Sequence, residues 1–276
     1  MIDLHIHSRC SDGSASVREI VAQYREMGFS HIAITDHDVI CTDPLPEPSE
    51  AGGLRVIPGI ELSLKDPASG RKVHLLGYFF DPAHPGLNIL IERIAASRKK
   101  AAVHIMAGLR QMGYPVEEEG VKPYSGSGGI YKQHILHYLL DQGLVRKMFG
   151  GLDRKLFGRG GPLYYPIDYA DFREGLATLR DAGALSVLAH PGQGQLFDLV
   201  EEMKELGLEG IEVTHPTHSQ ADREKSARLA GRLDLLQIPG SDNHGIYTQT
   251  RIHFERLTLE EQAEERLLGK LEEKLA

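Results

Sequence analysis

The sequence predicts an α/β fold, namely a distorted (β/α)7 barrel with a mainly helical inserted subdomain. Short runs rich in β-branched residues alternate with helical patterns in the first and last parts of the chain. Histidine and carboxylate residues stand near the ends of these runs, and the carboxyl ends of parallel barrel strands converge on one face. The 276 residues, 41% of them hydrophobic, are enough for one barrel with an insertion.

Seven short apolar runs are the expected strands. They cover residues 2–6, 32–35, 56–60, 73–78, 185–189, 211–213 and 235–238. Six of the seven carry His, Asp or Glu at or just past the carboxyl end, and the run 211–213 leads to His215. We therefore expect a closed parallel barrel whose polar side chains meet at one mouth.

Helical spacing of apolar residues predicts the remaining elements. The first helix is expected over 17–27, with Ser14 or Ser16 as its N-cap and Gly28 as its stop. Further helical patterns cover 87–112, 131–142, 168–182, 196–206, 220–233 and 259–275. The last of these is amphipathic, and we expect it to pack back on the barrel rather than to form a partner interface.

The strand pattern is interrupted in the middle of the chain. Residues 95–170 contain no expected strand, so they are assigned to an inserted lid or substrate subdomain, and 1–94 together with 171–276 are assigned to the barrel. Glycine-containing segments at 113–129 and 150–162 are expected to be irregular, the second acting as hinges of a mobile lid.

Charge and composition restrict the partners. The net charge of -8 argues against binding of long duplex nucleic acid. Six basic and two acidic residues lie between 132 and 159, which is either a solvated helix face or a lid that attracts a small anionic substrate. No membrane-spanning run or signal peptide is visible, which predicts a cytoplasmic protein. Cys10 and Cys41 are expected to be reduced thiols near the site mouth, not metal ligands.

Nitrogen and oxygen donors dominate the candidate site. Nine residues are the expected metal ligands: His5, His7, Asp12, His37, Glu61, His74, His190, Asp242 and His244. Alternate strand residues share a face, so His5 and His7 can bind one ion, and Glu61 has two oxygens with which to bridge two ions. Donor sets without thiolate suit Mn, Zn or Fe, and nine donors are enough for three such ions.

A multinuclear site of this kind suits hydrolysis of a phosphate ester. Bound divalent ions activate water and hold the anionic oxygens of phosphate. Amide or lactam hydrolysis in a similar barrel is an alternative, but one or two metals usually suffice for it. A barrel that binds metal or phosphate as a sensor, without catalysis, is the third and weakest hypothesis.

The same motifs resemble those of the polymerase and histidinol phosphatase (PHP) family. The matching segments are Asp3 to His7, Ser11-Asp12-Gly13, Thr35 to Asp38, Gly59-Ile60-Glu61, His74 to Gly77, Ala189-His190-Pro191 and Gly240 to Gly245. The resemblance implies a distorted (β/α)7 barrel with a trinuclear metal cluster. It assigns His5, His7, Glu61 and Asp242 to one ion, Glu61, His74 and His190 to a second, and Asp12, His37 and His244 to a third.

Within the family, the insertion and Asp12 resemble the branch of nucleoside 3',5'-bisphosphate phosphatases and 5'-3' exoribonucleases of short RNA. This implies a phosphomonoesterase of a small nucleotide, with a phosphodiesterase or 5'-3' exonuclease on short RNA, or a histidinol-phosphatase-like enzyme, as alternatives. By this analogy His215 and Arg9 are catalytic, and the expected substrate-binding residues are Arg9, Lys132, His134 and His215. The branch commonly has Arg-Pro-His where this chain has Lys132-Gln133-His134, and lysine lacks the bidentate phosphate contact of arginine.

Acidic residues beside the ligands are expected to orient imidazole rings. Asp36 and Asp38 flank His37, and at least one of them should accept a hydrogen bond from a metal-bound ring. Asp3 is expected to do the same for His5 or His7. His218 is the other histidine worth following, because it lies close to His215 in the sequence.

Overall fold

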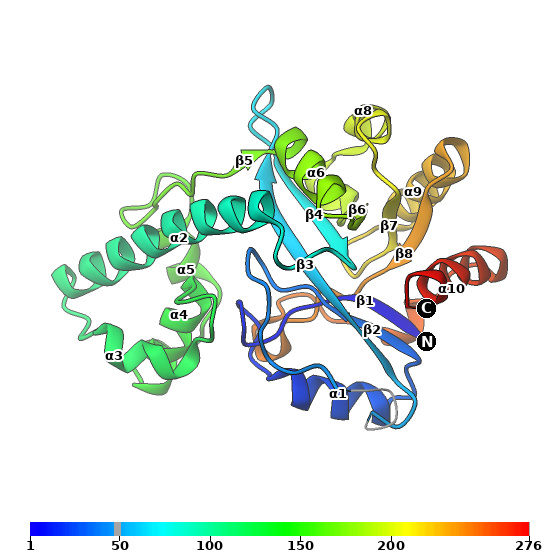
Figure 1. Ribbon diagram of the computed structural model, residues 1–276. Helices are drawn as coiled ribbons and strands as arrows, with labels where there is room; N and C mark the ends of the chain where they lie inside the picture. The colour runs from blue at the N-terminus through cyan, green and yellow to red at the C-terminus, as the bar shows by residue number, and fades with distance from the viewer. Residues whose placement is uncertain (47–50, 276) are drawn as a thin grey trace.

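The computed structural model describes residues 1–46 and 51–275, and within them a nearly closed, barrel-shaped sheet is surrounded by helices (Figure 1). The sheet order is β1-β2-β3-β4-β6-β7-β8, and the short β5 (Ala170–Asp171) pairs with β3. The predicted α/β barrel class is therefore confirmed.

Six strands of this order run parallel to one another. They are β1 (Ile2–Ile6), β2 (His31–Ile34), β3 (Arg55–Lys65), β6 (Leu185–Leu188), β7 (Gly210–Thr214) and β8 (Leu236–Pro239). The residues after β8 return to β1, where the His7 N–H donates to the Asn243 carbonyl at 2.9 Å and the Asp242 N–H donates to the His5 carbonyl at 2.9 Å. These bonds bring the two ends of the sheet together.

The strand β4 (Lys72–Tyr78) is antiparallel to both of its neighbours, β3 and β6. The expectation of an all-parallel barrel is therefore wrong at this strand. A tight turn joins β3 to β4, in which the Asp66 carboxylate accepts from the backbone N–H groups of Ala68 and Ser69. Such a short connection reverses the chain, because a parallel crossover needs a dozen or more residues.

Helices cover the outside of the sheet. The barrel carries α1 (Val17–Glu26), α6 (Phe172–Asp181), α7 (Pro191–Gly194), α8 (Val200–Glu205), α9 (Gln220–Leu233) and α10 (Glu261–Leu275). The N-cap of α1 is Ser16, which forms a capping box with Glu19. Leu267 and Leu271 of α10 are fully buried against the strands, so the tail helix packs on the barrel as expected.

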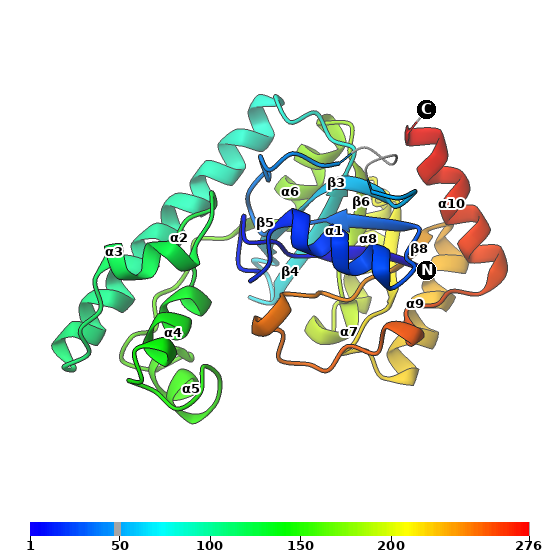
Figure 2. The same ribbon diagram turned by 90° about the horizontal axis from the view of Figure 1, so that it is seen from below.

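The middle of the chain forms a group of helices to one side of the barrel (Figures 1 and 2). It contains α2 (Pro85–Gln111), α3 (Glu118–Val121), a 3-10 turn at Lys122–Tyr124, α4 (Lys132–Asp141) and α5 (Gly151–Phe157). The segment 150–162 was expected to be an irregular loop, so α5 is a correction. Asp153 in its first turn and Arg154 with Lys155 in its last turn match the helix dipole.

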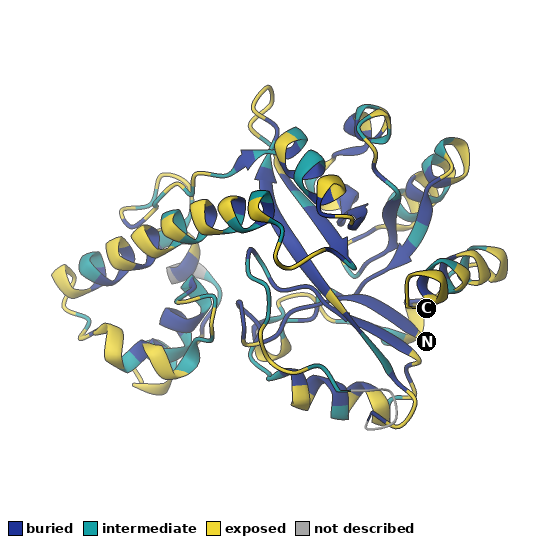
Figure 3. Ribbon diagram, viewed as in Figure 1, coloured by how far each residue is buried: buried dark blue, intermediate teal, exposed yellow. Residues whose placement is uncertain are grey.

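Buried side chains form separate clusters in the barrel and in this group. Figure 3 shows buried residues along the strands and exposed residues on the outer helix faces. Ile105, Leu109, Ile135 and Leu139 belong to a separate cluster built from α2, α3, α4, α5 and the loops beside them. The division at residue 95 stays a prediction, and α2 runs through it without interruption. No helix in the described segments is both long and apolar enough to cross a membrane.

Candidate metal centre

The carboxylate of Glu61 lies at the centre of a buried cluster of histidines. Its Oε2 is 3.2 Å from Nε2 of His5, 3.2 Å from Nε2 of His7 and 3.0 Å from Nδ1 of His37. His5 and His7 point to the same side because they alternate at the end of β1. Glu61 itself is in the middle of β3 and is fully buried.

The other oxygen of Glu61 faces two further histidines. Its Oε1 is 2.8 Å from Nδ1 of His74 and 3.1 Å from Nε2 of His190. His74 is near the amino end of β4, not the carboxyl end, and reaches the cluster because β4 runs antiparallel to β3. His190 follows β6 with φ of 26°, in the left-handed region that non-glycine residues rarely adopt.

Asp242 joins His5 and His7 on one side of the cluster. Its Oδ1 is 3.5 Å from Nε2 of His5 and 3.2 Å from Nε2 of His7. Asp242 also has a positive φ, 52°, and backbone outliers of this kind tend to gather at functional sites. Ligand atoms of His5, His7, Glu61 and Asp242 all lie within 4.8 Å of one another, which is close enough for one ion.

A second group of four lies on the opposite side of His7. Nε2 of His244 is 3.3 Å from Oδ1 of Asp12, and Nδ1 of His7 is 3.8 Å from the same oxygen. With His37 these residues form another set whose ligand atoms lie within 4.8 Å of one another, and His37, Glu61 and His74 form a third. All nine predicted donors therefore lie in one contiguous cluster, while their assignment to individual ions stays a prediction.

The donor set fits divalent metal ions. Within the described residues, buried atoms without a hydrogen-bond partner include Nδ1 of His7, Nδ1 of His37, Nδ1 of His74 and Oε2 of Glu61. Unsatisfied buried polar atoms are costly, and coordination to a cation removes that cost. Imidazole nitrogens and carboxylate oxygens without thiolate are typical ligands of Zn, Mn and Fe.

The electrostatics of the cluster also favour a cation. Burial alone would raise the pKa of the Glu61 carboxyl, but the nearby imidazoles of His37 and His5 hold it well below its usual range. Burial likewise acts to lower the pKa of His7, but Asp242 and Glu61 raise it to about 10. The carboxylates thus stabilise positive charge among the rings, whether a proton or a metal ion supplies it.

Glu212 is a residue of the site that sequence reasoning missed. Its Oε1 is 2.9 Å from Nδ1 of His5, and its Oε2 accepts the backbone N–H of His190 at 2.5 Å. Burial would raise the pKa of the Glu212 carboxyl, but His5 lowers it to about 2. A glutamate in the middle of the apolar strand β7 was the signal that could have identified it.

Three aspartates do not orient imidazole rings as expected. Asp3 accepts from the Tyr24 hydroxyl at 2.9 Å and from backbone N–H groups, not from a ring. Asp36 accepts from the backbone N–H groups and hydroxyls of Ser8 and Ser11. The bonds of Asp36 therefore stabilise the loop after β1 and orient no imidazole ring.

Asp38 also serves the framework of the site. It accepts from the Ser63 N–H at 2.7 Å and from the guanidinium of Arg98, a residue of α2. That guanidinium also stacks 4.5 Å from the ring centroid of Tyr131, whose hydroxyl donates to the His37 carbonyl at 2.7 Å. Asp38 and Tyr131 therefore fasten the helical group to the loop that carries His37.

A cavity of about 290 Å³ opens beside the cluster, and we call it the cluster cavity. The predicted ligands Asp12, His37 and His74 line one part of it. Three cationic residues and four tyrosines are also among its lining: Lys72, Arg98, Lys132, Tyr131, Tyr164, Tyr165 and Tyr169. The wall chemistry therefore suits an anionic ligand with a flat apolar part.

The predicted substrate residues are placed unequally. His215 is buried with its Nε2 3.6 Å from Oδ2 of Asp242, and Lys132 lines the cluster cavity while pairing with Asp153 at 2.9 Å. His134 is buried in α4, and its Nδ1 accepts the Tyr131 N–H. Arg9 is exposed, and its guanidinium donates to the Ser14 carbonyl.

His218 does not join the cluster. Its Nδ1 lies 3.0 Å from the Val213 carbonyl, and its Nε2 accepts the Gly192 N–H at 3.2 Å. His218 thus ties the turn after β6 to the end of β7, beside His215.

Cys10 and Cys41 form a disulfide, so the expectation of two reduced thiols is wrong in this structure. The loops after β1 and β2 lie side by side because these strands pair in parallel. Their cysteines have a Cα separation of 5.5 Å, which a disulfide can span. The bond links the loop that carries Asp12 to the loop that follows His37.

Comparison with known proteins agrees with this geometry. Residues 3–177 match the PHP domain. A phosphoribosyl 1,2-cyclic phosphate 1,2-diphosphodiesterase of Eggerthella lenta is 37% identical, over 88% of this chain and 94% of the relative. A 3',5'-nucleoside bisphosphate phosphatase of Chromobacterium violaceum is 32% identical over 88% and 87%, and a 5'-3' exoribonuclease of Haemophilus influenzae is 30% identical over 88% and 89%.

Solved structures share the fold over nearly the whole chain. A protein of Bifidobacterium adolescentis assigned as a metal-dependent phosphoesterase superposes with a TM-score of 0.81, at 27% identity, over 97% of this chain and 95% of its own. A protein of Chromobacterium violaceum described as an amidohydrolase with bound sulfate has a TM-score of 0.77, at 29% identity, over 96% of both chains.

Proposed function

The chain belongs to the PHP family of metal-dependent phosphoesterases, and we propose that it removes a phosphate group from a small nucleotide such as a nucleoside 3',5'-bisphosphate. The observation that carries this proposal is the cluster cavity. It places metal-type donors, three cationic side chains and four tyrosines around one space of about 290 Å³. Cations suit a phosphate, and tyrosine rings suit a nucleobase.

We further propose three divalent ions, of Mn, Zn or Fe. His5, His7, Glu61 and Asp242 would hold one ion. Glu61, His74 and His190 would hold the second, and Asp12, His37 and His244 the third. Such ions supply Lewis-acid stabilisation of phosphate oxygens and a nucleophile drawn from water near neutral pH.

Residues of this chain would position and protonate the substrate. The guanidinium of Arg98, held by Asp38 and stacked on Tyr131, lines the cavity as a fixed cation, and Lys72 and Lys132 line it as well. His215 lies beside Asp242 and also borders a smaller cavity of about 150 Å³, which shares Gln133 with the lining of the cluster cavity. We propose that its imidazole donates a proton to the leaving oxygen.

A cyclic or short-chain phosphodiester is the second candidate substrate. It is supported by the Eggerthella lenta relative, whose name specifies a cyclic phosphate diester, and by the exoribonuclease of Haemophilus influenzae. Lys132, which stands where the phosphatase branch commonly has arginine, lacks the bidentate phosphate contact of a guanidinium and so weakens the case for the bisphosphate.

Product analysis with a panel of substrates tests these proposals, by phosphate release for the monoesters and by chromatography of the products for the cyclic phosphate and the RNA. The Mn-loaded enzyme would be given adenosine 3',5'-bisphosphate, 5'-AMP, phosphoribosyl 1,2-cyclic phosphate, histidinol phosphate and a 5'-phosphorylated RNA oligomer. We expect the highest kcat/KM for the bisphosphate. A higher kcat/KM for the cyclic phosphate or the RNA would favour the second candidate, and turnover of histidinol phosphate alone would overturn both.

A further inference from the structure

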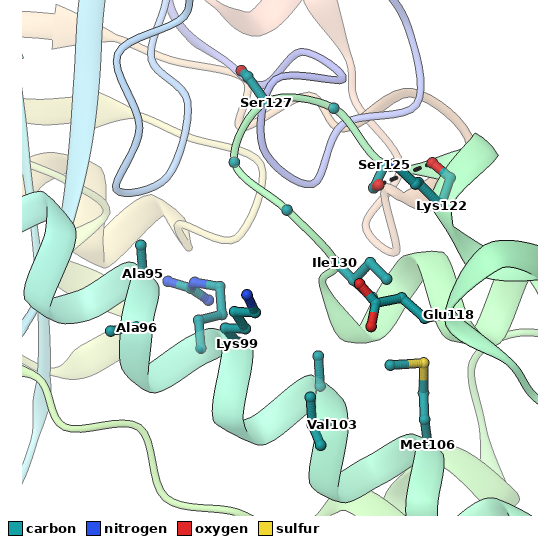
Figure 4. A pocket seen from close by; sticks show the side chains of 15 residues that line it. Ala95, Ala96, Lys99, Val103, Met106, Glu118, Lys122, Ser125, Ser127 and Ile130 are labelled. Carbon is teal, nitrogen blue, oxygen red and sulfur yellow. Dashed lines mark hydrogen bonds between the residues drawn. The ribbon is translucent and has the colours of Figure 1, made fainter.

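A second cavity, of about 370 Å³, lies between α2 and residues 125–130 (Figure 4), and we call it the insertion cavity. Arg98, Ala102 and Ile130 line both this cavity and the cluster cavity. The two cavities are therefore neighbours that share one wall. The cation in this wall, Arg98, also lines the cluster cavity next to the predicted metal ligands.

The insertion cavity combines an apolar floor with unpaired positive charge. Val103, Met106 and Ile130 contribute apolar surface, and Val103 is 48% exposed. Lys99 and Lys122 line the same space, and neither forms an ion pair in the described part of the chain. In a chain of net charge -8, two unpaired lysines beside exposed apolar surface suit a ligand with a flat apolar part and a phosphate.

One acidic side chain adds a further requirement on the ligand. Glu118 lies across the cavity from Lys99 (Figure 4). A carboxylate accepts hydrogen bonds and repels phosphate, so it favours a ligand that brings hydroxyl or amino donors to this wall. The ribose hydroxyls of RNA supply such donors, whereas a simple phosphate or a sulfate does not.

The wall formed by residues 125–130 is held against the metal centre. The Gly128 N–H donates to the Cys10 carbonyl at 2.7 Å. A Cβ at Gly126 would lie 2.0 Å from the Arg9 carbonyl oxygen, so only glycine allows this close approach. Arg9 and Cys10 belong to the loop that carries Asp12, which fixes the position of the insertion cavity relative to the metal ligands.

We propose that the insertion cavity is the subsite for a second ribonucleotide unit, next to the one whose phosphate lies at the metal centre. The inference rests on the second candidate of the proposed function, a short RNA, and adds the place in the fold where its second nucleotide would bind. Lys99 and Lys122 would contact the phosphate of the second unit, Glu118 its ribose, and the apolar floor its base.

Equilibrium binding to the metal-free protein tests the subsite without catalysis. The ligands are the 5'-phosphorylated RNA dinucleotide pApA and adenosine 3',5'-bisphosphate, measured by titration calorimetry. In Lys99→Glu/Lys122→Glu we expect Kd for pApA to rise at least about 10-fold, and Kd for the bisphosphate to change less than about 2-fold. The matched control is Lys100→Glu/Lys155→Glu, which reverses the same number of exposed lysines outside both cavities.

The outcomes separate the subsite from the proposed function. Equal changes in both constants, no change for pApA, or the same effect in the control variant would each overturn the subsite. If the wild-type enzyme neither binds nor hydrolyses the bisphosphate, the proposed function fails. The change in Kd for pApA between the wild type and Lys99→Glu/Lys122→Glu would still test the insertion cavity as a subsite. A deoxy dinucleotide should bind less tightly than pApA, and Glu118→Gln should reduce that difference.

Discussion

Oε1 of Glu212 lies 2.9 Å from Nδ1 of His5, and both side chains are fully buried. The other carboxylate oxygen accepts the His190 N–H. Glu212 therefore directs Nε2 of His5 toward Glu61 and also fixes the backbone at His190, so one carboxylate positions two predicted ligands. A Cβ at Gly240 would lie 1.9 Å from Oε1 of Glu212, which leaves no room for a side chain there.

Glu212→Gln keeps the shape of the side chain but removes its charge, and it leaves one of its two contacts without an acceptor. We expect a 10- to 100-fold loss in metal affinity and in kcat, because groups that orient metal-binding imidazoles have effects of this size. Metal titration of the stripped protein followed by kinetics checks this. Glu209→Gln, just before β7 and away from the cluster, should match the wild type.

Asp12→Asn tests the predicted number of ions. Asp12 contacts His244 and Gln133 but lies outside the group around Asp242, so its loss should remove one ion and leave the others. We expect elemental analysis to give about three metal equivalents for the wild type and two for the variant, with kcat at least about 100-fold lower. Unchanged stoichiometry would mean that the group at Asp12 does not bind metal.

Cys41→Ser tests the disulfide. The bond joins residues 31 apart in sequence, and closing a loop of this length corresponds to about 3 to 4 kcal/mol of unfolding free energy. Urea unfolding should show this loss in the variant and in the wild type after reduction, with no further loss when the variant is reduced. Thiol titration of the unfolded wild type should find no free thiol, and two thiols would contradict the pairing.

His134→Asn tests a pH dependence of stability in the helical group. Burial lowers the pKa of His134 to about 4, below the ordinary value of about 6.5. The unfolded chain therefore takes up the proton first, and the folded state loses stability as the pH falls from 6.5 to 4, by on the order of 2 kcal/mol. Asparagine still accepts the Tyr131 N–H through its carbonyl oxygen but does not titrate.

The variant His134→Asn should accordingly lose less unfolding free energy than the wild type between pH 7 and pH 4. Both proteins would be measured in EDTA, so that loss of metal in acid does not enter the comparison. His104→Asn, at an exposed position on α2, is the matched control. Identical pH profiles for the wild type and His134→Asn would contradict the prediction.

The sequence by itself determined the fold class, the family and the residues available as ligands. Alternating strand and helix patterns reflect local periodicity, and the motifs that carry His5, Glu61 and Asp242 are local as well. The same holds for the capping box of α1 and the amphipathic tail helix. These features depend on neighbouring residues, so the order of residues along the chain is enough to identify them.

Tertiary structure alone decided the direction of β4, the pairing of Cys10 with Cys41 and the role of Glu212. It also placed Arg98 of α2 against Asp38 and formed the two cavities beside the cluster. Each of these joins residues far apart in sequence through strand register and helix packing. A register shift of one residue turns a side chain to the other face, so local pattern does not specify such contacts.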